Sequence, residues 1–176
     1  MHSITKLFLY GWMLWLTPLM GGTFFNPHPA TTASVQHIDY ILVEKKQRRM
    51  SVFYQNQLLK TYNIDLGFAP LGDKQQEGDG KTPEGIYYIS YKNPHSKFYL
   101  SLRVSYPNKL DKEDARQRGV SPGGDIMIHG YGRSLAQVQK IYSLTDWTEG
   151  CIAVTNEEIQ EVYKATAVGT VIEIRP

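Results

Sequence analysis

Three short runs of alternating apolar and polar residues limit the fold of this chain more than any other feature. The runs cover residues 38–42, 50–54 and 58–64. Lys45–Arg48 supplies a charged turn between the first two runs, and Gln55–Gln57 supplies a tight turn before the third. Alternation with a period of two is the pattern of a half-buried strand, and short polar turns join antiparallel neighbours. The pattern therefore predicts an antiparallel meander.

The rest of the chain adds strands that are separated by turns and glycine-rich segments. Gly67–Gly80 has no periodicity and is predicted to be a long loop. No internal repeat or linker interrupts the body of the chain, so we expect a single, mainly β domain. Its further strands are predicted at Gly85–Tyr91, Leu100–Tyr106, Asp125–His129 and Thr170–Ile174.

A few short helices complete the predicted domain. The segments Asp111–Arg118 and Ser134–Ile141 each favour a short helix. After the cysteine, Thr155 and Glu158 have the spacing of a capping box, in which each side chain satisfies a free backbone donor at a helix start. Gly169 is the predicted end of this last helix.

The composition is that of an ordinary globular protein of 176 residues, with 41% apolar and 20% charged residues. A chain of this length is large enough to bury its own core. Its 19 Lys and Arg residues nearly balance 17 Asp and Glu residues, which gives a formal net charge of +2. So small a charge argues against a nucleic acid or an anionic membrane surface as the partner.

The first residues differ from everything that follows. Lys6 precedes the apolar run Leu7–Met20, which contains no charge, and this order is typical of a secretory signal. As a helix the run would reach about 21 Å, short of the roughly 30 Å hydrocarbon core of a bilayer. We expect residues 1–33 to be a signal peptide or an N-terminal membrane anchor, with the folded domain at 34–176 in the periplasm or cell envelope. A hydrophobic helix packed on the domain is the alternative.

Cys151 is the only cysteine of the chain, so no intramolecular disulfide is open to it. In an exported protein, a lone thiol is either a small buried residue or a functional group. Gly150 removes a side chain next to the thiol, and the predicted helix start nearby favours a lowered thiol pKa. On these features alone, core packing and nucleophilic catalysis both stay open.

A nucleophilic cysteine needs a base, because the thiolate is the reactive form. His129 is the candidate base, since it ends a short apolar strand where loops gather and is followed by Gly130. A structural histidine is the alternative interpretation. The other histidines lie in or near the leader or in a loop, and they are His2, His28, His37 and His95.

His129-Gly130, followed by Thr148-x-Gly150-Cys151, resembles the signature of the L,D-transpeptidase catalytic domain, the YkuD-type family. The stretch TPEG at residues 82–85 and SPGGDIMIHG at residues 121–130 resemble two further segments of that family. The resemblance extends over roughly Ile38–Arg175. Within the family, the sequence resembles a branch that is marked by the cysteine motif DWTxGCIAVTN.

The resemblance implies a β-sandwich or barrel with a few short helices, and a periplasmic or cell-wall enzyme. No cysteine or histidine pairs have metal-ligand spacing, so neither a metal nor a cofactor is expected. Members of the family act on peptidoglycan stem peptides, at bonds between an L- and a D-centre. Cys151 would be the nucleophile and His129 its base. The Gly130 carbonyl would orient the imidazole, and backbone amides around Glu149, Gly150 and Cys151 would form the oxyanion hole.

The resemblance leaves the acceptor of the acyl group open. An amine acceptor would give a cross-link or an attached protein, for which an outer-membrane lipoprotein is one candidate, and the enzyme is expected to be a monomer. Water as acceptor would make the protein a hydrolytic L,D-endopeptidase or carboxypeptidase. A wall-binding domain that has kept the fold without catalysis is the alternative from another class.

The chain departs from the family pattern around the cysteine. Glu149 stands where many relatives have histidine, and Ala153 stands where many have arginine. Arg133 is a candidate to replace that arginine in substrate binding, with a solvated loop charge as the alternative. Trp147 is a candidate wall of the substrate groove, with core packing as the alternative. Asp146 is expected to brace the cysteine loop.

Overall fold

The computed structural model describes residues 35–142 and 144–176, apart from the side chain of Leu135. The predicted signal or anchor at residues 1–33 lies outside these residues. Within the described part of the chain, no helix is long and apolar enough to cross a membrane.

The predicted antiparallel meander is present. Strands β1 (Ile38–Glu44), β2 (Arg49–Tyr54) and β3 (Gln57–Asn63) follow one another in the chain. β1 pairs antiparallel with β2, and β2 pairs antiparallel with β3. The alternating pattern thus predicted both the strands and their pairing.

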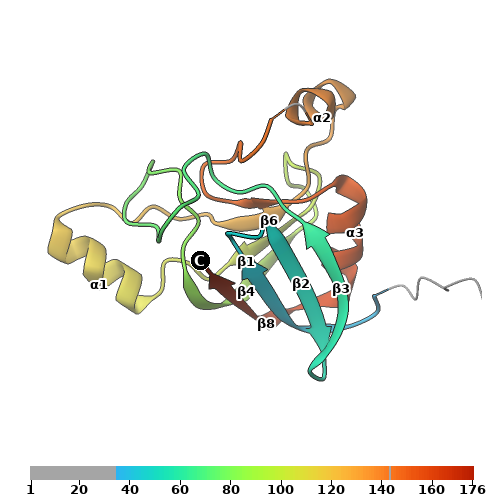
Figure 1. Cartoon of the computed structure of the whole chain (residues 1–176), viewed down its shortest axis with the longest axis horizontal. Helices are drawn as coiled ribbons and strands as arrows, with labels where there is room; N and C mark the ends of the chain where they lie inside the picture. Colours follow the sequence, from blue (N-terminus) through green and yellow to red (C-terminus); the bar gives the residue numbers. More distant parts are fainter. Residues whose placement is uncertain (1–34, 143) are drawn as a thin grey trace, which may run out of the picture. The chain divides into compact units, whose positions relative to one another are not determined.

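The described strands form one sheet in the order β3-β2-β1-β8-β4-β5-β6-β7. Strand β4 pairs with β8 through its first half and with β5 through its second half, so it joins two parts of a curled sheet (Figure 1). The predicted mainly β fold is confirmed. The remaining strands are β4 (Gly85–Asn93), β5 (Ser101–Val104), β6 (Met127–His129), β7 (Ile152–Ala153) and β8 (Thr166–Arg175).

Two of the strand pairs are parallel, which the sequence pattern did not predict. β8 pairs parallel with β1, and β7 pairs parallel with β6. The second pair matters for the site, because β6 ends in His129 and β7 begins immediately after Cys151.

The core fills the inner side of this sheet and is covered by α3 (Asn156–Ala165), which contacts β5 and β6. Ile159, Val162 and Ala165 are its buried residues. The predicted capping box is present: Glu158 N donates to Thr155 Oγ1 over 3.2 Å, and Thr155 N donates to Glu158 Oε2 over 2.9 Å. The cap fixes where the chain turns from the cysteine loop into the helix.

The predicted end of this helix at Gly169 is wrong. α3 ends at Ala165, and β8 begins at once with Thr166, which pairs with Ile38 of β1. Gly169 lies inside β8 with a φ of 94°, where the pairing between β1 and β8 shifts register. Pairing with β1 therefore ends the helix earlier than the local sequence indicates.

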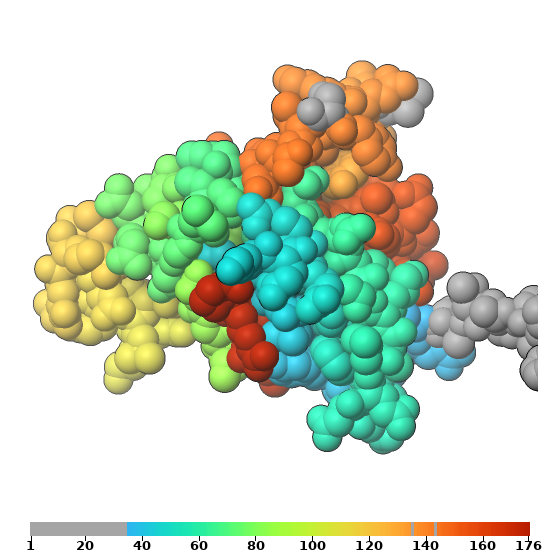
Figure 2. Space-filling view, in the orientation of Figure 1, coloured from blue at the N-terminus to red at the C-terminus, as the bar shows by residue number. Residues whose placement is uncertain are grey.

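The other helices and the histidine strand differ slightly from their predicted bounds. α1 (Lys109–Arg118) begins before the predicted start because Asn108 caps it, and α2 covers Leu135–Ile141. The predicted strand Asp125–His129 is shorter, since Asp125 has a φ of 55° and only Met127–His129 pair as β6. Figure 2 shows α1 in yellow and the segment around α2 in orange projecting from the sheet.

Candidate active site

Cys151 and His129 line the same cavity, which has a volume of about 720 Å³. They reach it from adjacent strands, because Ile128 pairs with Ile152 and His129 pairs with Ala153 in the parallel β6–β7 pair. Cys151 directly precedes this pair, so the two side chains that the sequence predicted to act together are brought to one place.

The tautomer of His129 follows from its hydrogen bond. The buried imidazole is held by a contact of 2.7 Å between Nδ1 and the Gly130 carbonyl. A carbonyl oxygen only accepts, so Nδ1 carries the hydrogen and Nε2 keeps its lone pair. The contact predicted between Gly130 and the imidazole is therefore present, and the ring is left with a basic nitrogen.

Aromatic side chains surround the imidazole. Phe98 stacks on it with ring centroids 4.4 Å apart, and Trp147 packs edge-to-face at 5.6 Å. Burial lowers the His129 pKa to about 4; the Gly130 hydrogen bond opposes this shift, and the charge of Lys97 adds to it. The imidazole is therefore neutral at neutral pH and can accept a proton.

The thiol of Cys151 is also neutral at neutral pH. Burial raises its pKa to about 11; a backbone hydrogen bond from Met127 opposes this, and the charges of Asp125 and Glu149 add to it. Sγ donates to the Asp125 carbonyl over 3.4 Å. The lowered pKa that the nearby helix start favoured is thus not found, because desolvation outweighs it. The pair is thus a neutral thiol and a neutral imidazole that line one cavity.

Acid should destabilise the fold through His129. The ordinary histidine pKa is 6.5 and the folded value is about 4, so the unfolded chain binds the proton first as the pH falls. Above pH 6.5, His129 is neutral in both the folded and the unfolded chain. As the pH falls from 6.5 to 4, only the unfolded chain gains the proton, so the free energy of unfolding falls by about 3 kcal/mol. Chemical denaturation at pH 7 and pH 4 of the wild type and of His129→Gln measures the difference; parallel losses in both proteins would contradict it.

Thr148 braces the cysteine loop, a role that sequence reasoning missed. Its buried hydroxyl donates to the Cys151 carbonyl over 2.8 Å and accepts from Gly150 N over 3.1 Å. A threonine that closes such a local turn is a recognisable signal in the spacing Thr-x-Gly-Cys. Since the Gly150 amide already donates to Thr148, it is engaged within the loop, and its predicted oxyanion role stays a prediction.

Asp146 braces the same loop from its other end, as predicted. Its carboxylate accepts from Leu66 N over 3.0 Å and from Arg48 Nη2 over 2.6 Å. Asp146 itself has a φ of 49°, in the left-handed region. The ion pair and the backbone hydrogen bond thus hold a turn that places Trp147 and Thr148 beside the cavity.

Residues 38–174 match the YkuD family, which is described as the L,D-transpeptidase catalytic domain. The chain belongs to this family. The match does not distinguish branches within the family, so membership of the branch with the motif DWTxGCIAVTN stays a prediction. The fold is the one that the resemblance implied, and the catalytic roles of Cys151 and His129 stay predictions.

Individual relatives resemble the chain over most of its length. YafK of Escherichia coli strain K12, named as a candidate L,D-transpeptidase, is 30% identical over 131 residues, or 71% of this chain and 46% of YafK. The helical cell shape determining protein Pgp2 of Campylobacter jejuni is 27% identical, with a TM-score of 0.62, over 79% of this chain and 48% of Pgp2. Bd1075 of Bdellovibrio bacteriovorus is 28% identical, with a TM-score of 0.54, over 81% and 52%. The chain spans about half the length of these relatives.

The remaining predicted site residues differ in where they lie. Glu149 and Trp147 line the same cavity as Cys151 and His129. Trp147 Nε1 also donates to Asp65 Oδ2 over 3.2 Å, and Tyr131 OH donates to the same oxygen over 3.4 Å. Trp147 is therefore fixed as a wall beside the histidine, while its contact with substrate stays a prediction.

Arg133 is not among the residues that line the cavity. Its guanidinium donates to three backbone carbonyls: Nε to Ser96 O over 2.8 Å, and Nη2 to Pro94 O over 2.8 Å and to Tyr99 O over 2.9 Å. Substrate binding by Arg133 stays a prediction, and these contacts do not favour it. The side chain is exposed, as the alternative of a solvated loop charge expects, and it also makes these three hydrogen bonds.

Two chain segments that the sequence did not place at the site form the cavity walls. Residues 74–78 contribute one wall, and residues 93–98 contribute another. Lys74 is buried and donates to Asp79 Oδ1 over 2.8 Å. Burial raises the Asp79 pKa, but Lys74 and three backbone amides outweigh it and lower the value to about 2. Asp79, in the predicted loop Gly67–Gly80, is thus part of a largely buried ion pair.

Gly150 tolerates no side chain beside the cysteine. Its φ is 125°, and a Cβ there would lie 2.5 Å from the Lys81 carbonyl oxygen. Gly150→Ala should cost about 1–3 kcal/mol through backbone strain, and the clash should displace Cys151 and slow its alkylation. Thermal unfolding and iodoacetamide labelling measure both effects. Gly169→Ala is the matched control, with a φ of 94° and no atom within 4 Å of its Cβ; equal effects at both positions would contradict the clash.

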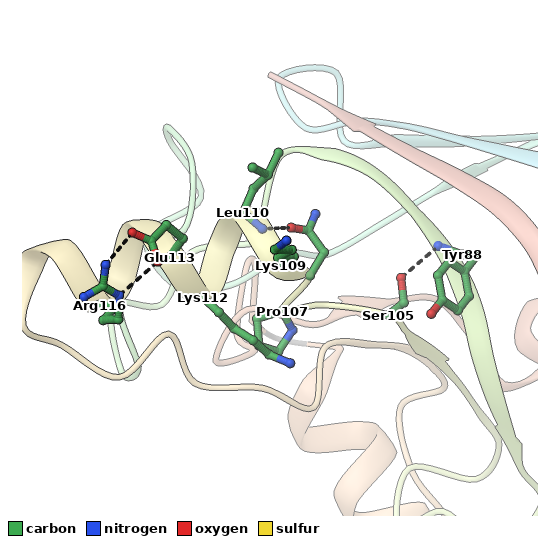
Figure 3. Close-up of a pocket in the computed structure, with 9 residues that line it drawn as sticks. Tyr88, Ser105, Pro107, Lys109, Leu110, Lys112, Glu113 and Arg116 are labelled. Atoms are coloured by element: carbon green, nitrogen blue, oxygen red, sulfur yellow. Dashed lines mark hydrogen bonds and ion pairs between the residues drawn. The ribbon is translucent and has the colours of Figure 1, made fainter.

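A second cavity of about 710 Å³ lies at the start of α1 and shares no lining residue with the first. Figure 3 shows some of its polar groups paired with their own neighbours: Tyr88 N donates to Ser105 Oγ, and Arg116 pairs with Glu113. It holds neither the cysteine nor a histidine, so the chemistry belongs to the first cavity. In the described residues, no group of three His, Cys, Asp or Glu side chains is arranged to hold a metal ion.

Proposed function

We propose that this chain is a cysteine-dependent L,D-transpeptidase that acts on peptidoglycan stem peptides through a thioester. The observation that carries the proposal is that Cys151 and His129 line one cavity, with Nδ1 of the imidazole held by the Gly130 carbonyl. Membership of the YkuD family supports the choice of substrate. The branch marked by the cysteine motif belongs to the same proposal.

The first step is acylation. Sγ of Cys151 attacks the carbonyl carbon of the bond between the L- and D-centres, while its proton passes to His129 Nε2. As the tetrahedral intermediate collapses, the carbon–nitrogen bond breaks and the same proton passes to the departing D-alanine amine. The thioester remains on Cys151. Because both groups start neutral, the proton moves during the attack, and no thiolate has to be formed in advance.

The second step transfers the acyl group. An acceptor amine attacks the thioester, His129 takes a proton from the amine, and the carbon–sulfur bond breaks to give an amide and the free thiol. A second stem peptide as acceptor gives a cross-link, and an outer-membrane lipoprotein as acceptor gives an attached protein. Water in place of the amine gives hydrolysis. Amides around Glu149 and Cys151 are proposed to stabilise the developing oxyanion.

Incubation with purified tetrapeptide muropeptides, followed by mass analysis, tests the proposal. A transpeptidase gives cross-linked dimers or, with an added D-amino acid, exchange of the terminal residue. Release of D-alanine with tripeptide as the only product assigns the protein to the hydrolytic alternative. An unchanged tetrapeptide in the presence of a reactive Cys151 would leave the wall-binding alternative.

The site of action is proposed to be the periplasm or cell envelope, where peptidoglycan lies. The support is the basic residue and apolar run at the start of the chain, Lys6 and Leu7–Met20. Pgp2 is described as a cell shape determining protein, and a role in cell shape is proposed by extension. N-terminal sequencing of the protein from the cell is expected to begin near Ser34, or at Met1 in the membrane fraction. An intact chain in the cytosol would contradict both.

A further inference from the structure

The wall of the cavity next to His129 is an irregular segment between β4 and β5. It carries Phe98, whose ring stacks on the imidazole with centroids 4.4 Å apart. The next residue, Tyr99, has a φ of 76°, a left-handed conformation that costs free energy in a residue with a bulky side chain. Within the segment, Phe98 N donates to Ser96 Oγ over 3.1 Å, and contacts from outside the segment add to this support.

Arg133 is the side chain that holds the segment. Its guanidinium donates to the carbonyls of Pro94, Ser96 and Tyr99, one of which belongs to the strained residue itself. Hydrogen bonds from a charged donor are stronger than those between neutral groups. The planar guanidinium can serve three acceptors in a fixed arrangement, which a lysine ammonium does less well.

The base of Arg133 is fixed as well. Asn156, at the start of α3, accepts from the amides of Tyr131 and Gly132 over 3.0 and 3.3 Å, and donates to the Gly132 carbonyl over 2.7 Å. These bonds hold the loop that runs from His129 to Arg133. The histidine and the arginine that anchors its stacking partner are thus held by one loop.

We propose that Arg133 is a positioning residue for His129, acting through the segment 94–99 and the ring of Phe98. The inference rests on the role of His129 in the proposed function. Without Arg133, the strained segment relaxes, Phe98 leaves the imidazole and water reaches the ring. The imidazole then loses both its fixed orientation and its apolar cover.

The other charged and titratable groups near His129 have to be separated from this effect. Lys97 lies in the same segment and lowers the His129 pKa through its charge. The remaining groups share the cavity with the imidazole, and they are Lys74, Glu77, His95, Asp125, Glu149 and Cys151. None of these groups is replaced by a substitution at Arg133. Arg133→Met also removes a positive charge, and Arg133→Lys, which keeps the charge, separates that effect from movement of the segment.

The test is Arg133→Met in the full chain, which keeps an apolar stem and removes every donor. NMR titration of the His129 ring, assigned by its loss in His129→Gln, should show a midpoint at least one pH unit higher than in the wild type. Alkylation of Cys151 by iodoacetamide at pH 7 should slow about tenfold, part of the usual contribution of a general base. With muropeptide substrate, the substitution should lower kcat and leave KM unchanged. Loss of an arginine that binds substrate would instead raise KM.

Three further variants make the result specific. Arg133→Lys should restore part of the alkylation rate. Phe98→Leu should reproduce the effects of Arg133→Met, and the double variant should be no worse than either, because both act on one contact. Arg116→Met, in an exposed pair with Glu113 on α1, should change nothing.

An unchanged His129 titration and alkylation rate in a folded Arg133→Met protein would overturn the inference, as would full additivity with Phe98→Leu. Circular dichroism establishes folding in each variant. Neither of the two main measurements uses peptidoglycan. Failure of the wild type on muropeptides would therefore count against the proposed function alone, while the positioning role would still be decided by the titration.

Discussion

Cys151→Ala should abolish turnover of muropeptides while leaving the fold intact. The chain has one cysteine, so no second thiol can form the thioester. Loss of a catalytic nucleophile typically lowers kcat by a factor on the order of 10⁴ or more. Comparing product formation by wild type and variant under the same conditions measures the loss.

The fold should survive because the substitution removes only the sulfur atom of one side chain. The thiol is partly exposed at the cavity, and its hydrogen bond to the Asp125 carbonyl is long at 3.4 Å. Losing it should change the free energy of unfolding by about 1 kcal/mol or less. The loop itself is held by Thr148 and Asp146, which the substitution does not touch. A thermal melt within a few degrees of the wild type is the control.

A carbapenem or a thiol reagent gives an independent check. The wild type should gain one adduct, located at Cys151 by peptide mapping, and Cys151→Ala should gain none. Product formation by the alanine variant at the wild-type rate would end the assignment of Cys151 as nucleophile. Failure of the wild type to label would instead favour a buried structural thiol, one of the two interpretations that the sequence left open.

The strands of the first half of the chain were predictable because their signal is local. The alternating runs at 38–42, 50–54 and 58–64 set one face of each strand, and short turns between them allow only antiparallel pairing. The parallel pairing of β1 with β8 was not predictable in this way, since its partners lie more than a hundred residues apart. The same pairing explains why the helix end at Gly169 was misplaced.

The cysteine and histidine were predictable for a similar reason, since each stands in a short motif with a distinct local pattern. The residues that position them were harder to find. Arg133 donates to the carbonyls of Pro94, Ser96 and Tyr99, residues 34 to 39 positions earlier in the chain. Every residue has a backbone carbonyl, so the amino-acid sequence of the segment that accepts these hydrogen bonds does not indicate that it accepts them.

Thr148 shows the opposite case. Its contacts reach only two and three residues along the chain, to Gly150 and Cys151, so a local pattern contains them. The long-range neighbours of the same loop, such as Asp65 with its hydrogen bond to Trp147, become visible only when the segment after β3 bridges to Thr148 and Ala153. Local bracing of a nucleophile can be predicted from sequence, whereas the aromatic surroundings of its base cannot.

The aromatic surroundings also decide how the pair works. Burial lowers the His129 pKa to about 4 and raises the Cys151 pKa to about 11. A preformed thiolate–imidazolium pair would require the opposite shifts. In the proposed mechanism the proton therefore passes from sulfur to nitrogen as the new bond forms, and the rate should depend on His129 as a base at every pH where the thiol is protonated.

His129→Ala should slow acylation of Cys151 by a factor on the order of 10² to 10⁴, the usual contribution of general acid–base catalysis. The imidazole is unprotonated above its pKa of about 4. Wild-type alkylation by iodoacetamide should therefore rise around pH 4 and then stay nearly level through neutral pH. Below pH 4 the protonated Nε2 can accept no proton, so the rate falls.

The variant should show a different pH profile as well as a lower rate. Without a base, the reaction depends on the small fraction of thiolate, which grows about tenfold per pH unit until the pH approaches the Cys151 pKa of about 11. Alkylation followed from pH 4 to pH 10 should thus give a level wild-type profile and a steeply rising variant profile that approach each other at high pH. His95→Ala is the matched control, because His95 lines the same cavity without a hydrogen bond to the Gly130 carbonyl, and its profile should follow the wild type. Identical rates and profiles for wild type and His129→Ala would show that another group takes the proton, and the neutral pair would no longer explain the chemistry of this site.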